Sequence, residues 1–283
     1  MVRKRPAKRR RARRRRTRRL GRWLPSRQRR RRWLRALRRA PAWVRLGAAA
    51  GVLAATALAT NAVYQVARKP TELFFPVSGT LAKTPAGTWA TYGRSFRRHA
   101  TDVIRADLLA ALAQVEGSGD PVARPPWRWA WRVDPREIYR PASSAVGMYQ
   151  ITDGTFEQAR RLCIHDHRVV EEGPWHAWKS CWFVWSYFRV VPSHAIELTS
   201  AFLDRSVSRA LARAGLRGVS LEQKQRLAAL IHLCGAGAGS RQVKRGLGST
   251  AGMRCGTHDA SAYLAKVARM QRVFRELAAR DDA

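Results

Sequence analysis

The sequence predicts an all-α domain preceded by one transmembrane helix and a disordered basic tail. Residues 1–45 hold 23 Lys or Arg and no acidic side chain, and residues 46–67 form an uncharged run of 22 residues. From residue 100 onward, apolar residues recur at helical spacing, and the sequence contains no strand of convincing alternation. We therefore expect a tail over 1–45, a transmembrane helix over 46–67, a linker over 68–99 and a globular domain over 100–283. Irregular packing of the segment 68–98 over the domain is the alternative to a linker.

Most of the excess charge belongs to the tail. The chain of 283 residues has 55 basic and 19 acidic side chains, for a net charge of +36, and its first acid is Glu72. A segment so rich in Arg buries no core and is expected to be disordered or only locally helical. The composition excludes collagen, a coiled coil and a multi-span membrane protein.

The uncharged run has the length of one membrane span. Because the block of 23 basic residues precedes it, the positive-inside rule predicts a cytoplasmic tail, bound to anionic lipids, and an exported domain. Two alternatives remain open: the run is a cleaved signal, since Ala57-Leu58-Ala59 resembles a signal-peptidase site, or it is a soluble Ala-rich helix. Specific nucleic-acid recognition is not expected, although Arg-rich tails also bind DNA or RNA without sequence specificity.

Capping residues mark the helices of the globular domain. Ser220 with Gln223 forms a capping-box pattern, and Gly117 ends the first helix. Helices are expected to begin at Asp102, Asp153, Ser193, Ser220 and Asp259. An aromatic stripe at helical spacing predicts one more core helix, and a platform for sugar rings is the less favoured interpretation. The stripe consists of Trp175, Trp178, Trp182, Trp185 and Phe188.

Glu116 is the first candidate for chemistry. It stands where a helix ends and a Gly-containing turn, residues 117–121, follows. The C-terminal end of a helix and apolar neighbours such as Leu112 both disfavour a carboxylate anion. These surroundings suit an acid that must donate a proton near neutral pH, although a Glu in a last helical turn is more commonly a solvated surface residue.

Two segments with conspicuous glycines follow. Residues 143–155 read Ser-Ser-Ala-Val-Gly-Met-Tyr-Gln-Ile-Thr-Asp-Gly-Thr. In this segment Gly147 lets backbone approach a ligand, and Gln150 offers a donor and an acceptor to sugar hydroxyls or amides. Residues 232–239 read His-Leu-Cys-Gly-Ala-Gly-Ala-Gly and lack the Lys of a phosphate-binding loop.

In this order the segments resemble the lytic transglycosylase SLT domain of the lysozyme-like superfamily. The family pattern is Glu-Ser-x-x-Asp/Asn-Pro, then Gly-Leu-Met-Gln-Ile-x-Pro-Gly-Thr, then Ala-x-Tyr-Asn-Ala-Gly-x-Gly, then a Tyr near the start of a late helix. Glu116 matches the acid and Tyr263 the late Tyr, within residues 100–275. The other matched positions are Asp120, Pro121, Gly147, Gln150, Ile151, Gly154, Thr155, Ala236, Gly237 and Gly239.

The resemblance implies an enzyme that cleaves the β-1,4 bond between MurNAc and GlcNAc in peptidoglycan, without cofactor or metal. Glu116 would protonate the bridging oxygen, then take a proton from the C6 hydroxyl of MurNAc, which attacks its own C1 and leaves a 1,6-anhydro sugar. Asp120 and Glu137 are expected to be structural. The resemblance implies that the glycan strand contacts Ser118, Ser144, Met148, Gln150, Ala236 and Tyr263.

This substrate places the domain in the periplasm of a Gram-negative bacterium, anchored by a single pass through the inner membrane. Two other functions remain open. One is a goose-type lysozyme-like muramidase, which would hydrolyse the same bond with water. The other is a glycan-binding or scaffold domain without enzymatic activity.

The chain departs from the family pattern at several positions. Gly117 follows the acid where the family has Ser, and Asp153 replaces Pro. Cys234 and Gly235 stand where the family has Tyr and Asn. The connection 122–141 is longer than usual, and both core packing and stacking on sugar rings would account for its aromatic residues Trp127, Trp129 and Trp131.

The four cysteines allow three disulfide pairings. Short loops cost the least closure entropy, and an exported domain favours disulfides. We therefore predict the pairs Cys163–Cys181 and Cys234–Cys255. A zinc site is the less favoured interpretation, because the spacing is not a recognised zinc pattern, and its ligands would come from Cys163, His165, His167, His176 and Cys181.

Overall fold

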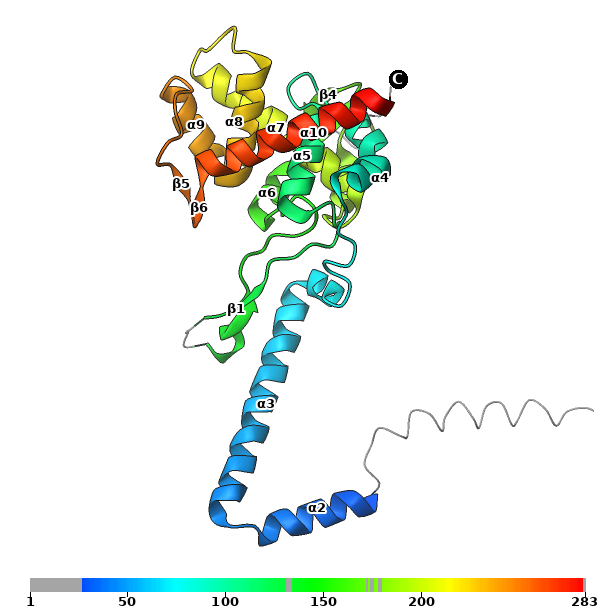
Figure 1. The fold of residues 1–283 in the computed structure, drawn as a ribbon, viewed down its shortest axis with the longest axis vertical. Coiled ribbons are helices and arrows are strands. Elements are labelled where there is room, and N and C mark those ends of the chain that lie inside the picture. The colour runs from blue at the N-terminus through cyan, green and yellow to red at the C-terminus, as the bar shows by residue number, and fades with distance from the viewer. Residues whose placement is uncertain (1–26, 131–133, 172, 174–175, 178–179, 282–283) are drawn as a thin grey trace, which may run out of the picture. The chain divides into compact units, whose positions relative to one another are not determined.

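The computed structural model describes residues 27–130, 134–171, 173, 176–177 and 180–281 (Figure 1). The chain divides into two compact units, Met1–Asn61 and Ala62–Ala283. For residues 1–26 the predicted disordered tail lies outside the described part of the chain. The rest of the tail is locally helical, because α2 spans Arg27–Arg39.

A long helix, α3 (Ala42–Arg68), contains the uncharged run. Within the described part of the chain, it is the one helix long and apolar enough to cross a membrane. The helix extends from the first unit into the second, whose first residue is Ala62. The prediction of one candidate membrane span is therefore confirmed at the level of length and composition.

The second unit is mostly helical. Pro85 and Pro192 stand in the first turns of α4 and α7, where proline needs no intrahelical partner for its nitrogen. The elements are η1 (Pro70–Phe74), α4 (Pro85–Arg98), α5 (Ala106–Gly117), η2 (Pro135–Glu137), α6 (Asp153–Ala159), η3 (Trp182–Ser186), α7 (Pro192–Arg213), α8 (Leu221–Cys234), α9 (Ala236–Lys244) and α10 (Ala260–Asp281).

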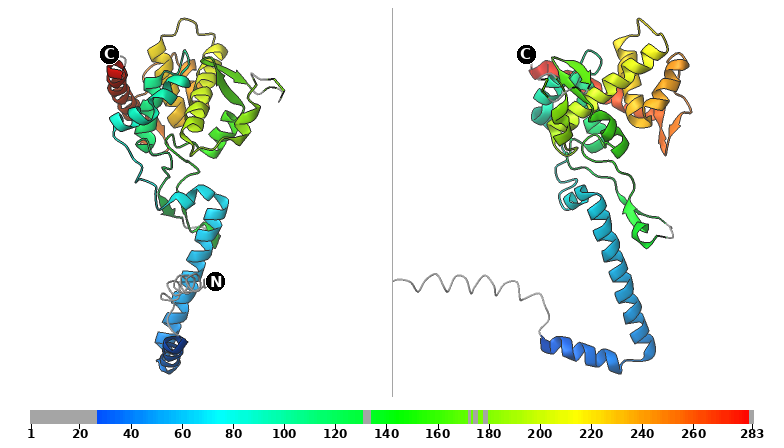
Figure 2. Two further views of the ribbon diagram at one scale, coloured as in Figure 1. Left: turned by 90° about the vertical axis from the view of Figure 1, so that its right-hand side faces the viewer. Right: turned by 180° about the vertical axis from the view of Figure 1, so that it is seen from behind.

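Among the described residues, the chain forms three short antiparallel hairpins. They pair β1 (Trp127–Trp129) with β2 (Tyr139–Pro141), β3 (Leu162–His165) with β4 (Arg168–Glu171), and β5 (Arg254–Cys255) with β6 (His258–Asp259). The β1–β2 hairpin projects away from the helical domain (Figure 2). Strands of two to four residues are too short to show alternation, so the sequence did not reveal them. The expectation of an all-α domain is confirmed only as mostly helical.

The helix α5 is the centre of the core. Residues 108–113 are all fully buried, because α4, α7 and α10 pack around the helix. A helix buried on every side needs no polar face, which explains the continuous apolar run Leu-Leu-Ala-Ala-Leu-Ala. Glu116, in the next turn, is thereby held at the end of a rigid element.

Most predicted helix starts agree with the structure within a residue. The capping box of Ser220 and Gln223 is present at the start of α8. The prediction for Asp102 is wrong, since α5 begins at Ala106. Before it, Thr101 Oγ1 accepts hydrogen bonds from the amides of Val103 and Ile104, which forms a turn. The helix α9 was not predicted from the sequence, since its glycines suggested a helix exit.

The segment 68–99 is part of the domain and not a linker. Its helix α4 buries Trp89 and Phe96, which are 4% and 0% exposed. The Trp89 ring packs against Phe274 of α10, and its indole nitrogen donates to Asp281. Proline, glycine and threonine obscured the period of this helix in the sequence, so the globular part was predicted to begin too late.

Over its described residues, the aromatic stripe does not form an α-helix. Its described part contains the single 3-10 turn η3, and Trp182, Trp185 and Phe188 are 47%, 66% and 63% exposed. The prediction that this stripe is core is therefore wrong for these three residues. Trp175 and Trp178 lie outside the described residues.

Both predicted cysteine pairs lie at disulfide distance. The Cα atoms of Cys163 and Cys181 are 5.4 Å apart, and those of Cys234 and Cys255 are 5.3 Å apart. The first pair links β3 to the start of η3. The second links the end of α8 to the hairpin before α10, so it connects the third motif to the segment that carries Tyr263.

Candidate acid–base site

Glu116 and Tyr263 meet at the end of α5. The hydroxyl of Tyr263, in the first turns of α10, donates a hydrogen bond of 2.5 Å to Oε1 of Glu116. The carboxyl side chain is 19% exposed. Burial, reinforced by the Glu116 carboxyl, raises the pKa of Tyr263 well above its usual value, so the phenol keeps its proton and acts as a donor.

His232 is a third member of the site and was not among the residues predicted from the sequence. It lies in the last turn of α8, with Nε2 3.8 Å from Oε1 of Glu116. Burial lowers the pKa of His232, although Glu116 and a hydrogen bond with the Tyr149 backbone act in the opposite direction. The imidazole is therefore neutral at pH 7. A polar residue at the Ala position of the third motif was the signal for it.

The departure at Gly117 has a steric reason. A Cβ atom at this position would lie 2.8 Å from Cα and 3.0 Å from the carbonyl oxygen of Met148. The backbone of the second motif thus packs directly on the residue after the acid, where only glycine fits. Met148 itself is fully buried, so its side chain supports this contact and does not face a substrate.

Gln150 uses its amide hydrogens within its own loop. Its backbone has a left-handed φ of 48°, and Nε2 donates to the carbonyl oxygens of Ala123 at 3.2 Å and Gly147 at 2.9 Å. These two bonds hold the side chain against its own loop. Gln150 lines a cavity of about 230 Å³ between α6 and α8, together with His232 and Gly235.

The other predicted substrate-binding residues occupy different surroundings. Ser118 is exposed in a left-handed conformation at the C-cap of α5, and its carbonyl accepts from the Lys83 amide. Ser144 accepts a hydrogen bond from the Asp153 amide at the start of α6. Ala236 is the half-buried first residue of α9. These contacts do not involve Glu116, so Glu116, Tyr263, His232 and Gln150 form the compact part of the site.

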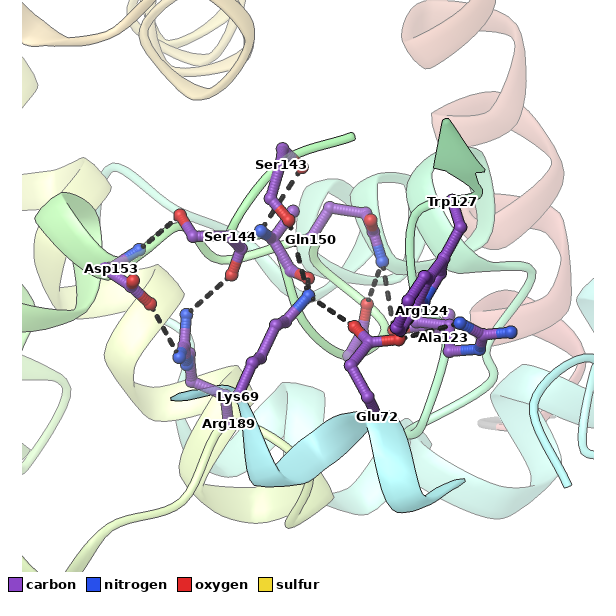
Figure 3. Close-up of polar contacts among 12 residues, drawn as sticks. Lys69, Glu72, Ala123, Arg124, Trp127, Ser143, Ser144, Gln150, Asp153 and Arg189 are labelled. Carbon is purple, nitrogen blue, oxygen red and sulfur yellow. Dashed lines mark hydrogen bonds and ion pairs between the residues drawn. The ribbon is translucent and has the colours of Figure 1, made fainter. Parts of the chain in front are cut away.

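The segment after α3 supports the loop of the second motif (Figure 3). Nζ of Lys69 donates to the carbonyl oxygen of Ala145 at 2.9 Å and lies 2.9 Å from Oε1 of Glu72. Oε2 of Glu72 accepts from Arg124 at 2.7 Å and from Trp127 at 2.6 Å. Burial alone would raise the pKa of Glu72, but these hydrogen bonds and the Lys69 charge hold it below the usual value.

Arg189 secures the same loop from another side (Figure 3). Its guanidinium donates to the carbonyl oxygens of Ser144 at 3.1 Å and Ile151 at 2.8 Å, and it lies 2.8 Å from a carboxylate oxygen of Asp153. Asp153, which replaces the family's Pro, therefore anchors the loop through an ion pair. Two basic residues thus fix the backbone that packs on Gly117.

The residues considered for zinc do not assemble. Cys163 and Cys181 pair with each other, and the Nδ1 atom of His167 lies 2.8 Å from the Ala100 carbonyl oxygen. Among the residues that the structure describes, no three His, Cys, Asp or Glu side chains come together as metal ligands. The described cysteines therefore serve the fold.

Comparison of the chain with protein-family models, with curated proteins and with solved structures finds no match. The site itself has three defining features: a carboxyl group at the end of a buried helix, a phenol that donates to it, and a neutral imidazole beside a cavity. A single titratable carboxyl with a fixed donor is typical of acid–base chemistry.

Proposed function

We propose that this protein is a membrane-anchored lytic transglycosylase that cleaves MurNAc–GlcNAc β-1,4 bonds of peptidoglycan without water. The observation that carries this proposal is the hydrogen bond between Tyr263 and Glu116, because it joins the first and the fourth motif at one carboxyl group. Gln150 and His232, from the second and third motifs, line the adjacent cavity. Four motifs far apart in sequence thus converge on one place.

The chain's own residues provide each proton transfer. Protonated Glu116 donates its proton to the bridging oxygen, and the C1–O bond breaks with an oxocarbenium-like state at C1. The resulting carboxylate is stabilised by the Tyr263 hydroxyl. Glu116 then takes the proton of the C6 hydroxyl while the C6 oxygen bonds to C1. The carboxyl group ends protonated, and the products are a free GlcNAc hydroxyl and a 1,6-anhydro sugar.

Asp120 and Glu137 have structural partners, which supports a one-carboxylate route. Asp120 is 1% exposed, and its two carboxylate oxygens accept from the amides of Gly79 and Val122. Glu137 pairs with Arg68 at 2.9 Å. A hydrolytic muramidase would need a group that activates water, and neither of these carboxylates is free for that role.

The proposed location follows from the charge pattern. The 23 basic residues before the uncharged run favour a cytoplasmic tail next to anionic lipids, with α3 as the single span of the inner membrane. The domain then faces the periplasm of a Gram-negative bacterium, where its peptidoglycan substrate lies.

Mass spectrometry of the released muropeptides tests the function. The full-length protein in detergent is incubated with purified sacculi, and we expect 1,6-anhydro ends. Glu116→Gln keeps the shape of the side chain and removes its titratable proton, so the rate should fall at least ~10²-fold. Glu276→Gln, an exposed change on α10, is the matched control and should leave the rate unchanged.

Other outcomes distinguish the alternatives. Reducing ends in place of anhydro ends would identify a muramidase. Binding of sacculi without any released product would favour a glycan-binding scaffold. A Glu116→Gln protein that keeps most of the wild-type rate would show that Glu116 is not the acid.

A further inference from the structure

The hairpin of β1 and β2 carries an aromatic face. Its antiparallel register places Arg128 opposite Arg140 and Trp129 opposite Tyr139, so the rings and the arginines alternate between the two faces. The Tyr139 ring lies 4.7 Å from the Trp129 ring and 5.2 Å from the Trp127 ring, centre to centre. Trp129 is 60% exposed, so this stack ends at the surface and not in a core.

The hairpin runs back along the chain toward the membrane-spanning segment. At its base, the indole nitrogen of Trp127 donates to Glu72 at 2.6 Å. At its turn, the carbonyl oxygen of Arg136 accepts from Nε2 of Gln65 at 2.7 Å. From base to turn, the contacts therefore move from Glu72, after α3, to Gln65, within α3.

The turn lies at the level of the last uncharged residues of α3. The guanidinium of Arg136 stands over the Tyr64 ring, 5.2 Å from its centre, and Arg68 pairs with Glu137 at 2.9 Å. Tyr64 belongs to the uncharged run 46–67. The end of a span is the depth of the lipid headgroups, where Trp and Tyr rings are enriched and basic side chains meet phosphates.

We propose that the β1–β2 hairpin is a second membrane contact, in which Trp129 inserts among the headgroups and upper acyl chains of the leaflet that faces the domain. Arg128, exposed on the other face, meets lipid phosphate. This inference depends on α3 crossing the membrane and not on the enzymatic proposal. A domain attached at two points cannot turn freely about the end of α3, so its cavity keeps a constant orientation to the membrane surface.

Fluorescence quenching by brominated lipids tests this contact, because bromine on the acyl chains quenches only indoles that reach them. The full-length protein and its Trp129→Phe variant are placed in nanodiscs of phosphatidylcholine and phosphatidylglycerol, with and without bromine. The difference between the two proteins is the emission of Trp129. We expect bromine to reduce this component about twofold or more, as for an interfacial indole.

Two further variants make the result decisive. Leu216→Trp adds an indole in the turn between α7 and α8, and the added emission should be unaffected by bromine. The Trp43→Phe difference reports on the first turn of α3 and should show quenching. A quenched Trp43 component with an unquenched Trp129 component would overturn the hairpin contact while leaving the span in place.

The remaining outcomes also overturn the proposal. If neither Trp43 nor Trp129 is quenched, α3 is not inserted and the hairpin contact falls with it. If bromine does not quench the Trp129 component, but its emission changes when peptidoglycan fragments are added, the aromatic stack is a sugar platform. Both outcomes are independent of whether Glu116→Gln loses activity.

Discussion

The hydroxyl of Tyr263 donates a hydrogen bond of 2.5 Å to Oε1 of Glu116, although the two residues are 147 positions apart. This contact exists because α10 packs along α5 in the core, which brings the first turns of one helix to the last turn of the other. A donor held by helix packing is preorganised for a carboxylate, so it stabilises the anion without rearrangement.

Replacing Tyr263 by Phe should lower kcat/KM for anhydro-muropeptide release about 10- to 100-fold, which corresponds to the loss of a hydrogen bond to a charged group. The fold should persist, since only the hydroxyl is removed. Far-UV circular dichroism during heating checks this. Tyr92→Phe, in the buried face of α4, is the control and should keep near-wild-type kinetics. Full activity in Tyr263→Phe would separate this contact from catalysis.

Adding one methyl group at Gly117 should lower the reaction rate by more than any loss of folding stability would explain. In Gly117→Ala the new Cβ meets the Met148 backbone, so the loop that carries Gln150 must shift, and the rate should fall at least about tenfold. Gly154→Ala is the matched control, because nothing lies within 4 Å of a Cβ there. Equal rates in both variants would contradict the close packing of loop and acid.

Stability should decline as the pH falls below about 6.5, the ordinary pKa of histidine. Burial lowers the pKa of His232 in the folded state, so the unfolded chain binds its proton first. The free energy of unfolding therefore falls through this range and stays lower below the folded-state pKa. Burial lowers the pKa values of His99 and His194 too, against the opposing charge of Glu197.

Urea unfolding at about pH 8 and about pH 5 measures this dependence. His232→Gln should make the free energy of unfolding less dependent on pH, because one of the three protons taken up on unfolding is removed. The contributions of His99 and His194 should remain. An unchanged difference between the two pH values in the variant would mean that His232 is not titrated on unfolding.

A phosphatase reporter that is active only in the periplasm should be active at the C-terminus of the full-length protein. Translocating the 23 basic residues instead of the domain would be far costlier, which is the physical basis of this orientation. The mature chain should retain its tail, as shown by its intact mass. An inactive reporter would place the domain in the cytoplasm and remove peptidoglycan as its substrate. Loss of the tail would indicate a cleaved signal.

Local features were predictable from the sequence. The capping box at Ser220, the end of a helix at Gly117 and the start of α10 near Asp259 depend on residues a few positions apart. The cysteine pairs followed from short loops. Periodicity failed where tertiary contacts override it. Trp182, Trp185 and Phe188 are exposed around one 3-10 turn, while α4, with little visible period, lies in the core.

The sequence by itself determined the basic tail, the uncharged run and the order of the motifs, because charge, length and spacing are properties of the linear chain. Only the tertiary structure decided which side chains meet. It placed the neutral imidazole of His232 beside Glu116, pressed the Met148 backbone onto Gly117 and folded the β1–β2 hairpin back to the end of α3. Such contacts depend on how helices pack and where loops close, and no local pattern encodes them.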